Sequence, residues 1–218
     1  MQSCIPGSTK QVNPKLSQLH ADGAVLIEIK ELVLDEEITH LRKVGDEQGL
    51  APSQTVSGTA SSVVSEARTS RSAFLPKGND PVVRCIENRL ATIAGEARTH
   101  LEPLQITDYT HKQQFRKHHD YFNAGEGDPE RTTTIFTYLQ DSGVSDGACG
   151  GATCFHQLEG RDAPLCVFPK RGNALMWSNR KPNGDVNPAT LHSGEPITCA
   201  GAHKVGLNAW FRDQPFAS

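Results

Sequence analysis

A His-x-Asp motif at His118 and Asp120 is the arrangement in this sequence best suited to metal chemistry. The surrounding residues, Phe115–Tyr121, predict a strand, in which residues two apart lie on one face about 6.6 Å from each other. His118 and Asp120 can therefore converge on one ion while His119 points away. Two histidines and one carboxylate on one face of an octahedron are the ligands of non-haem iron(II) oxygenases. The third ligand would be a histidine distant in the sequence.

The motif alone is weak evidence for a metal site, because a His-x-Asp triplet can arise by chance. The sequence holds nine histidines, and the same spacing recurs at His20-Ala21-Asp22. The alternative for either copy is an exposed pair in a strand or a turn, which binds no metal. The rest of the chain must decide between these interpretations.

The composition predicts one ordinary domain without a polyanionic or membrane partner. The chain has 218 residues and a formal net charge of −3, and a domain usually takes about 100–200 residues. A charge near neutral gives no reason to expect nucleic acid. No apolar run approaches the roughly 18 residues of a membrane helix. We therefore expect a monomer that binds neither nucleic acid nor a membrane.

The N-terminus and the cysteines bear on the compartment. Residues 1–7 lack the basic start and the apolar core that a signal peptide needs. We expect a cytoplasmic protein if the chain is complete, and a secretory-pathway protein if a targeting segment is missing from it. The six cysteines include no Cys-x-x-Cys pair, so all six are expected to be reduced thiols.

Two segments of the N-terminal part lack a regular pattern. Residues 1–18 are polar without a sustained period, so they predict a tail, and residues 19–218 then form a single domain. Residues 51–72 are rich in Ser, Thr, Gly and Ala. They predict a long loop or a weak hairpin, and a loop of this length is a candidate lid over a site.

The helical signals stand on either side of that loop. Before the first helix, Ala24–Ile29 predict a strand. Asp35 is then expected to be the N-cap of a helix whose first turn carries acidic residues. Asp80 before Pro81 predicts the start of a second helix, because proline is favoured at the first helical position.

After Pro103 the pattern changes to short strands separated by turns. Helices followed by many strands favour an α+β fold, in which a barrel or sandwich carries helices on one side. The predicted strands are Leu104–Tyr109, Phe115–Tyr121, Thr132–Leu139, Thr153–His156, Leu165–Phe168, Ala174–Trp177, Ile197–Cys199 and Lys204–Phe211.

The last of these strands has two faces of different character. Alternate residues of a strand point to opposite sides of the sheet. One face is expected to line a polar cavity and the other to pack on the core. The cavity face holds Lys204, Asn208, Trp210 and Arg212, and the core face holds Val205, Leu207, Ala209 and Phe211.

From residue 68 to residue 212, short motifs follow one another in an order that resembles the prolyl 4-hydroxylase family of 2-oxoglutarate- and iron-dependent dioxygenases. They are Arg68-Thr69-Ser70, Ala73-Phe74-Leu75-Pro76-Lys77-Gly78, Tyr109, His118-x-Asp120-Tyr121-Phe122, Arg131-x-x-Thr134 before Tyr138-Leu139, Gly150-Gly151-Ala152-Thr153, Pro169-x-x-Gly172-Asn173, His192-Ser193-Gly194-x-Pro196, Gly201-Ala202-His203-Lys204 and Trp210-Phe211-Arg212. A series in a fixed order is far more specific than any single motif.

The resemblance implies a double-stranded β-helix (jelly roll) barrel with its core at about 104–213 and the N-terminal helices packed against one sheet. It implies that His118, Asp120 and His192 are the catalytic residues and bind Fe(II). Lys204 would bind the distal carboxylate of 2-oxoglutarate, with hydroxyl groups of Tyr109 and Thr153 as further donors. This agrees with the need of a buried carboxylate for a charged partner and hydrogen bonds.

The resemblance also implies the reaction. A peptidyl proline would be converted to 4-hydroxyproline while 2-oxoglutarate is decarboxylated to succinate and CO2, with O2 consumed and ascorbate as a stimulant. The partner would be a proline-containing peptide or protein. Arg131 and Trp210 take positions that would contact it.

The sequence departs from the family pattern in two places, and two alternative functions remain. Twelve residues separate His192 from Lys204, where ten are common in the family, and Phe115 replaces a tyrosine that touches the target proline. One alternative is a 2-oxoglutarate oxygenase acting on another target, such as lysine or asparagine. The other is a non-catalytic barrel with a structural metal.

Overall fold

The computed structural model consists of two main antiparallel β-sheets, a separate two-stranded hairpin and two α-helices, and it describes residues 1–21, 23–57, 61–64, 66–122 and 130–216. The elements are β1 (Lys15–His20), β2 (Leu26–Lys30), α1 (Asp35–Gln48), β3 (Ala51–Pro52), β4 (Gln54–Ser57), β5 (Ser61–Val64), β6 (Arg71–Phe74), α2 (Pro81–Ala94), a 3-10 turn at Arg98–His100, β7 (Gln105–Tyr109), β8 (Phe115–His118), β9 (Arg131–Ser142), β10 (Thr153–Phe155), β11 (Leu165–Val167), β12 (Ala174–Ser178), a 3-10 turn at Pro188–Thr190, β13 (His192–Gly194) and β14 (His203–Arg212).

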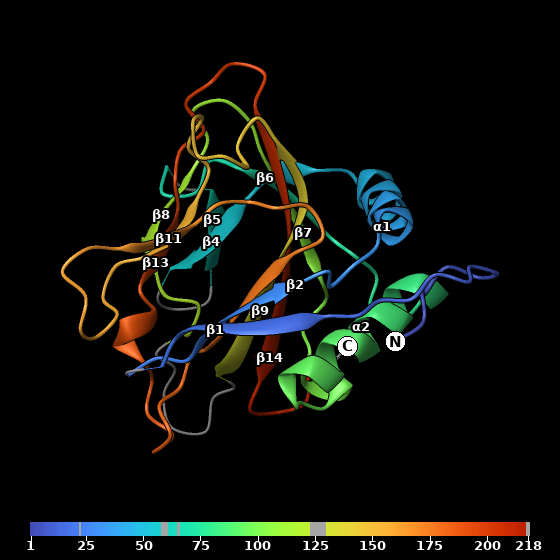
Figure 1. Ribbon diagram of the computed structural model, residues 1–218, viewed down its shortest axis with the longest axis horizontal. Helices are drawn as coiled ribbons and strands as arrows, with labels where there is room; N and C mark the ends of the chain where they lie inside the picture. Colours follow the sequence, from blue (N-terminus) through green and yellow to red (C-terminus); the bar gives the residue numbers. More distant parts are fainter. Residues whose placement is uncertain (22, 58–60, 65, 123–129, 217–218) are drawn as a thin grey trace.

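The two sheets differ in size and carry the helices on one side only. The large sheet has the order β1-β2-β12-β9-β14-β7-β6-β3, and the small one has the order β11-β10-β13-β8. Both helices lie against the large sheet on the side away from the small sheet, to the right in Figure 1. This is the predicted jelly-roll layout, with helices covering one sheet.

Two apolar clusters hold these layers together. The first joins the helices to the large sheet and includes Ile38, Leu41, Val83, Ile86 and Leu90 with the whole predicted core face of β14. The second lies between the sheets and contains the aromatic residues Phe136, Tyr138, Phe155 and Trp177. The alternation predicted for β14 is confirmed for Lys204, Asn208 and Trp210, which line the pocket between the sheets, whereas Arg212 pairs with Glu102 outside it.

The helix starts match the sequence signals closely. The Asp80 carboxylate accepts hydrogen bonds from the backbone N–H groups of Val82 and Val83 at 2.8 and 2.9 Å, so Asp80 is the predicted N-cap of α2. In α1 the prediction is wrong by one residue. Leu34 is the N-cap and Asp35 is the first helical residue, where its charge still favours the helix dipole.

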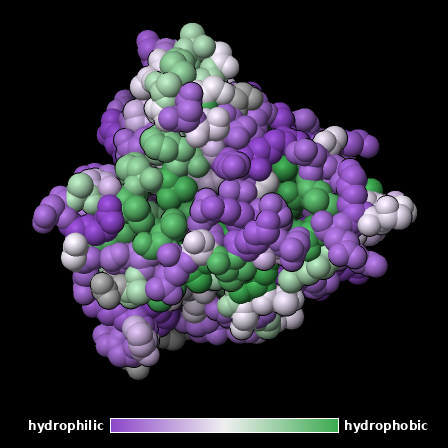
Figure 2. Space-filling view, viewed as in Figure 1, coloured by the Kyte–Doolittle hydropathy of each residue, from purple (hydrophilic) through white to green (hydrophobic). Residues whose placement is uncertain are grey.

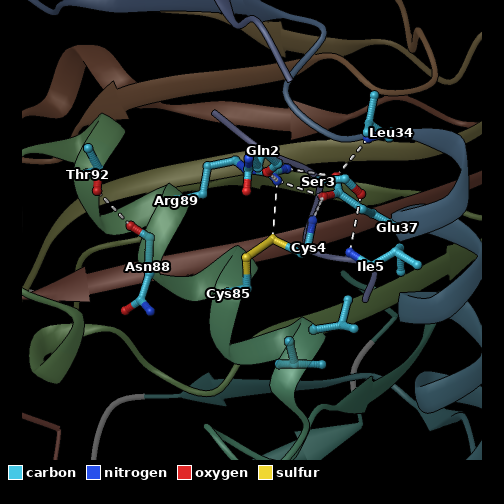
Figure 3. The surroundings of a disulfide bond; sticks show 12 residues. Gln2, Ser3, Cys4, Ile5, Leu34, Glu37, Cys85, Asn88, Arg89 and Thr92 are labelled. Atoms are coloured by element: carbon cyan, nitrogen blue, oxygen red, sulfur yellow. Dashed lines mark hydrogen bonds and ion pairs between the residues drawn. A yellow bond between two sulfur atoms is a disulfide. The ribbon is translucent and has the colours of Figure 1, made fainter. Parts of the chain in front are cut away.

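The N-terminal residues are not the predicted tail. β1 pairs with β2 along the edge of the large sheet, and Cys4 is disulfide-bonded to Cys85 of α2. Figure 3 shows this anchor beside the ion pair of Glu37 and Arg89, with Gln2, Ser3 and Ile5 packed around it. The sequence pattern failed here because an exposed edge strand needs few apolar residues.

The cysteines contradict the prediction of reduced thiols. Three disulfides join Cys4 to Cys85, Cys149 to Cys199 and Cys154 to Cys166, and all six cysteines lie within the described residues. Their sequence separations of 81, 50 and 12 residues give no local spacing signal, so only the fold shows the pairing.

Two further segments differ in detail from their predictions. The segment 51–72 contains β3, the start of β6 and the hairpin of β4 with β5, while residues 58–60 and 65 lie outside the described residues. The strand predicted at Ile197–Cys199 is wrong, because the strand of the small sheet is β13, just before it. β13 carries His192-Ser193-Gly194, which contains no strong strand former.

Most of the surface in the view of Figure 1 is hydrophilic, with apolar patches at its left and centre (Figure 2). Among the described residues, no helix is both long and apolar enough to cross a membrane.

Candidate active site

His118, Asp120 and His192 converge at one end of the small sheet. His118 ends β8 and His192 begins β13, and the two residues are directly paired across these strands. The Asp120 carboxylate lies 3.6 Å from Nε2 of His118 and 3.8 Å from Nε2 of His192. Among the described residues, these three form the one group of His, Cys, Asp and Glu side chains placed to hold a metal ion.

The local geometry of the motif differs from the predicted strand. β8 stops at His118, and Asp120 follows in a bend that turns its carboxylate toward both imidazoles. His119 is half-buried, and its Nε2 lies 3.1 Å from the carbonyl oxygen of Pro188. The other His-x-Asp copy cannot be compared, because Asp22 lies outside the described residues.

Each histidine is held so that the same nitrogen faces the cluster. Nδ1 of His118 lies 2.8 Å from the Arg116 carbonyl oxygen, and Nδ1 of His192 lies 2.9 Å from the Thr190 carbonyl oxygen. A carbonyl can only accept, so each Nδ1 carries a proton, and Nε2 of the neutral ring then presents a lone pair. Both imidazoles are thus set in the tautomer that binds a metal.

The ionisation states complete this donor set. Burial, and secondarily His192, lowers the pKa of His118 to about 3, so its imidazole is neutral near pH 7. Burial alone would raise the pKa of Asp120, but His192, His118 and Arg131 together lower it. Two imidazole nitrogens and one carboxylate oxygen fit Fe(II) and leave other positions on the ion open.

Aromatic rings enclose the two histidines. Phe115 stacks on His118 with ring centroids 3.5 Å apart, and Trp177 and Phe155 lie 4.8 and 5.6 Å from the ring of His192. These rings fix the imidazole planes and keep water from that side. Neither Phe155 nor Trp177 was predicted to belong to the site, because an aromatic residue in a strand is usually core.

Lys204 lies in the same pocket with its charge unpaired. Its side chain is only 3% exposed, and Nζ donates to the Gly151 carbonyl oxygen at 2.8 Å, with Oγ1 of Thr153 at 3.5 Å. No carboxylate forms an ion pair with it among the described residues. A buried ammonium without a counter-ion is costly, so this end of the pocket suits an anionic ligand.

Tyr109 and Thr153, the predicted hydroxyl donors, both lie beside this lysine. Tyr109 is the direct partner of Lys204 across β7 and β14, and its ring centroid is 5.6 Å from Nζ. Thr153 also accepts a 3.0 Å hydrogen bond from the hydroxyl of Tyr138. Tyr138 was missed, although alternation along β9 could have revealed it, since Thr134 and Phe136 share its face.

Gly150 and Gly151 form a turn beside Lys204, which donates a hydrogen bond to the Gly151 carbonyl oxygen. We call this turn the floor of the pocket. Gly150 and Gly151 both have positive φ, at 71° and 75°, and a Cβ on Gly150 would lie 2.2 Å from the Pro196 carbonyl oxygen. The predicted Gly-Gly turn therefore needs glycine in order to approach the segment after β13. The disulfide of Cys149 with Cys199 joins the same two segments.

A narrow pocket with a cavity volume of about 40 Å³ brings most of these groups together. Its lining includes the three candidate ligands, Lys204, Tyr109 and Thr153 at one end, and Trp210 at the other. The structure therefore brings together seven of the eight site residues predicted from the sequence.

The eighth, Arg131, is engaged beside the pocket. Its guanidinium forms a two-point ion pair with Glu102, at 2.7 and 2.8 Å, and stacks on Trp210 with Cζ 3.8 Å from the ring centroid. Glu102 also accepts a hydrogen bond from Arg212. Hydrogen bonds from both arginines lower the pKa of Glu102 despite its burial. Sequence reasoning did not identify Glu102, since it stands outside every motif.

Comparison with known proteins gives one family. The sequence model of the 2OG-Fe(II) oxygenase superfamily matches residues 104–212. The chain is 30% identical over 212 residues to prolyl 4-hydroxylase 2 of Arabidopsis thaliana, a match that covers 88% of this chain and 66% of that protein. The chain thus spans about two thirds of the length of such relatives.

Solved structures show the same fold. A viral collagen prolyl hydroxylase from Paramecium Bursaria Chlorella virus-1, in complex with 2OG, superposes with a TM-score of 0.66 at 20% identity, covering 86% of this chain and 95% of that one. A Trichoplax adhaerens prolyl hydroxylase bound to a peptide fragment of hypoxia inducible factor gives a TM-score of 0.62 at 13% identity, covering 86% and 83%. These likenesses confirm the predicted jelly-roll fold.

Proposed function

Because the chain belongs to the 2OG-Fe(II) oxygenase superfamily, we propose that it hydroxylates peptidyl proline to 4-hydroxyproline while converting 2-oxoglutarate to succinate and CO2. One observation carries this proposal: a His, Asp and His cluster shares its pocket with a buried lysine that has no counter-ion. The first suits Fe(II) and the second suits a dicarboxylate. The prolyl 4-hydroxylases of Arabidopsis thaliana, which this chain resembles over most of its length, support proline as the target.

Each group of residues has a separate task in this proposal. His118, Asp120 and His192 hold the metal, which supplies the redox chemistry with O2 that side chains lack. Lys204 pairs with the distal carboxylate of 2-oxoglutarate, and Thr153 and Tyr109 add hydroxyl donors. The rings around the histidines keep the reacting centre dry.

The opposite end of the pocket is left for the peptide. Trp210 offers an apolar face to a proline ring, and the Arg131 stack with the Glu102 pair holds that indole in place. Phe115, which has no hydroxyl, packs on His118, so contact with the target at this position is apolar.

A peptide panel tests the target. The protein is incubated with Fe(II), 2-oxoglutarate and equal amounts of proline-rich, lysine-rich and asparagine-rich peptides, and each peptide is analysed by mass spectrometry. We expect a gain of one oxygen atom on proline only. Modification confined to lysine or asparagine would replace proline as the target, and succinate release without any peptide product would exclude a peptide hydroxylase.

The affinity for 2-oxoglutarate is expected to fall as the pH rises above about 7. Burial lowers the pKa of Lys204 from 10.5 to about 7, and nearby Glu195 opposes this only in part. Below that pH the ammonium is already charged. Above it, binding must first take up a proton, so Kd rises by up to about tenfold per pH unit.

Calorimetry with Mn(II) and without O2, on both sides of pH 7, checks this dependence. His118 does not titrate in this range, because its pKa is about 3. In Lys204→Arg the side chain stays charged, so the affinity should be weaker overall but lose its slope above pH 7. An equal slope in both proteins would assign the pH dependence to another group.

The disulfide of Cys149 with Cys199 is expected to support 2-oxoglutarate binding. The segments it joins also exchange hydrogen bonds, from Thr198 N to Cys149 O at 2.9 Å and from Gly151 N to Pro196 O at 3.1 Å. Gly151 O in turn accepts from Lys204. Loosening this floor by changing both cysteines to serine should raise Kd for 2-oxoglutarate by roughly 2–30-fold.

The matched control removes the disulfide of Cys4 with Cys85, which lies against α2 outside the pocket. That double serine variant should bind 2-oxoglutarate as the wild type does, at a temperature where both variants are folded. An equal loss in the two variants would mean that general destabilisation, not the floor of the pocket, weakens binding.

We also propose that the protein works in an oxidising compartment. Three disulfides in one domain are typical of secreted and secretory-pathway proteins and rare in a reducing cytosol. Thiol labelling of the denatured protein from its native source should find no free cysteine, whereas six labelled thiols would place it in a reducing compartment.

A further inference from the structure

A buried chain of two hydrogen bonds ends on the Asp120 carboxylate. Oγ1 of Thr134, on β9, donates to Oδ2 of Asp120 at 2.8 Å. Nδ2 of Asn179, just after β12, donates to the same Oγ1 at 2.9 Å. Thr134 and Asn179 have no exposed surface, so water does not compete for these bonds.

The direction of this chain follows from chemistry. An ionised carboxylate only accepts hydrogen bonds, so the single hydroxyl proton of Thr134 must point to Asp120. The Thr134 oxygen is then left to accept, and Asn179 must turn its NH2 group toward it. The backbone holds Asn179 in place through hydrogen bonds to Thr132 and from Asn187, at 2.7 and 2.8 Å.

We propose that Thr134, oriented by Asn179, is a positioning residue that makes Asp120 a one-oxygen ligand. This inference rests on the proposed function, in which Asp120 binds the metal. Oδ2 faces Nε2 of His192 at 3.8 Å, but one of its lone pairs is taken by Thr134 and the carboxylate cannot rotate freely. Oδ1 lies 3.6 Å from Nε2 of His118 and accepts no hydrogen bond from Thr134, so it is the oxygen better placed for the ion. A carboxylate that bound through both oxygens would take a position needed by 2-oxoglutarate or O2.

The same strand provides a matched control. Thr137 stands three residues further along β9 and is equally buried, at 1% exposed. Among the described residues, its hydroxyl has no hydrogen-bond partner. Thr134→Val and Thr137→Val therefore make the same chemical change in the same strand, but only the first removes a hydrogen bond to Asp120.

Titration of the whole protein with Mn(II) alone tests the proposal. Loss of an outer hydrogen bond to a metal ligand typically weakens metal affinity by about 10–100-fold. We expect a loss of this size in Thr134→Val, a smaller one in Asn179→Ala, and wild-type affinity in Thr134→Ser and Thr137→Val. With Co(II), the visible absorption of Thr134→Val should also change in intensity, since this intensity reports the number of ligands.

The outcomes separate this inference from the proposed function. If Asp120→Ala abolishes Mn(II) binding while Thr134→Val and Asn179→Ala leave affinity and Co(II) spectrum unchanged, the positioning role is wrong and the metal site stands. If Asp120→Ala binds Mn(II) as the wild type does, the metal site itself is wrong. If Thr134→Val does not fold, Asn179→Ala and Thr134→Ser decide the question, because both keep a hydroxyl next to Asp120.

Discussion

Replacing Asp120 with alanine is expected to lower metal affinity and succinate production by more than about 100-fold, beyond the usual effect of losing an outer hydrogen bond. Asp120 supplies the one negative charge among the three candidate ligands, and it is only 7% exposed. Its removal leaves two imidazoles in an aromatic pocket without a carboxylate ligand. His118→Ala should have a comparable effect, since it removes one of two nitrogens.

His119, which stands between these two residues in the sequence, provides the control. His119→Ala changes the same residue type one position from each ligand, but its ring contacts Tyr121 and the Pro188 carbonyl oxygen instead of the cluster. We expect it to retain wild-type Mn(II) affinity and succinate production. If His119→Ala is as inactive as His118→Ala, or if a substitution of His20 abolishes metal binding, the metal lies elsewhere.

Replacing Glu37 with glutamine is expected to cost about 3–5 kcal/mol of unfolding free energy, because it leaves a buried arginine without a counter-ion. Glu37 of α1 has no exposed surface. Its carboxylate accepts two hydrogen bonds from Arg89 of α2, at 2.6 and 2.7 Å, and others from the backbone N–H groups of Cys4 and Leu34, at 2.7 and 2.9 Å (Figure 3). This one group ties together both helices and the N-terminal segment.

Urea unfolding of Glu37→Gln beside Glu47→Gln measures this contribution. Glu47 lies in the same helix, but its side chain is 58% exposed and pairs with Lys43 at 3.8 Å, an arrangement that contributes about 0–1 kcal/mol. If the two variants lose similar stability, the buried pair is not the anchor of the N-terminal segment.

The Glu37 carboxylate also makes the stability of the wild-type protein depend on pH in the acid range. Burial would raise the pKa of Glu37, but the bonds from Arg89, Leu34 and Cys4 lower it below 4.5. The folded protein thus holds the ionised form more strongly than the unfolded chain does. Its stabilisation is complete above about pH 4.5 and is lost as the pH falls through the folded-state pKa, and Glu37→Gln should lack this loss.

The sequence predicted the chemistry of the site better than its surroundings. His118 and Asp120 stand two residues apart, and Lys204 and Trp210 stand on one face of one strand, so local spacing is enough to group them. His192 could be added only through resemblance to a family, since nothing local links it to His118. Tyr138, Glu102 and Asn179 reach the site through tertiary contacts, which a single sequence does not display.

The errors in the fold have a common physical origin. An edge strand such as β1 and a three-residue strand such as β13 depend on pairing with a neighbour, and their own residues carry little strand propensity. Disulfides likewise depend on distance in space. Helix α2 was predictable because its cap, its first proline and its apolar face all lie within one short segment.

The most direct test of the proposed reaction measures both products in one tube. Wild-type protein with Fe(II), 2-oxoglutarate, O2 and a proline-rich peptide should form succinate and 4-hydroxyproline in equal amounts, and Asp120→Ala should form neither. Succinate that forms equally fast without the peptide, with no 4-hydroxyproline in the peptide recovered, would contradict the proposed function.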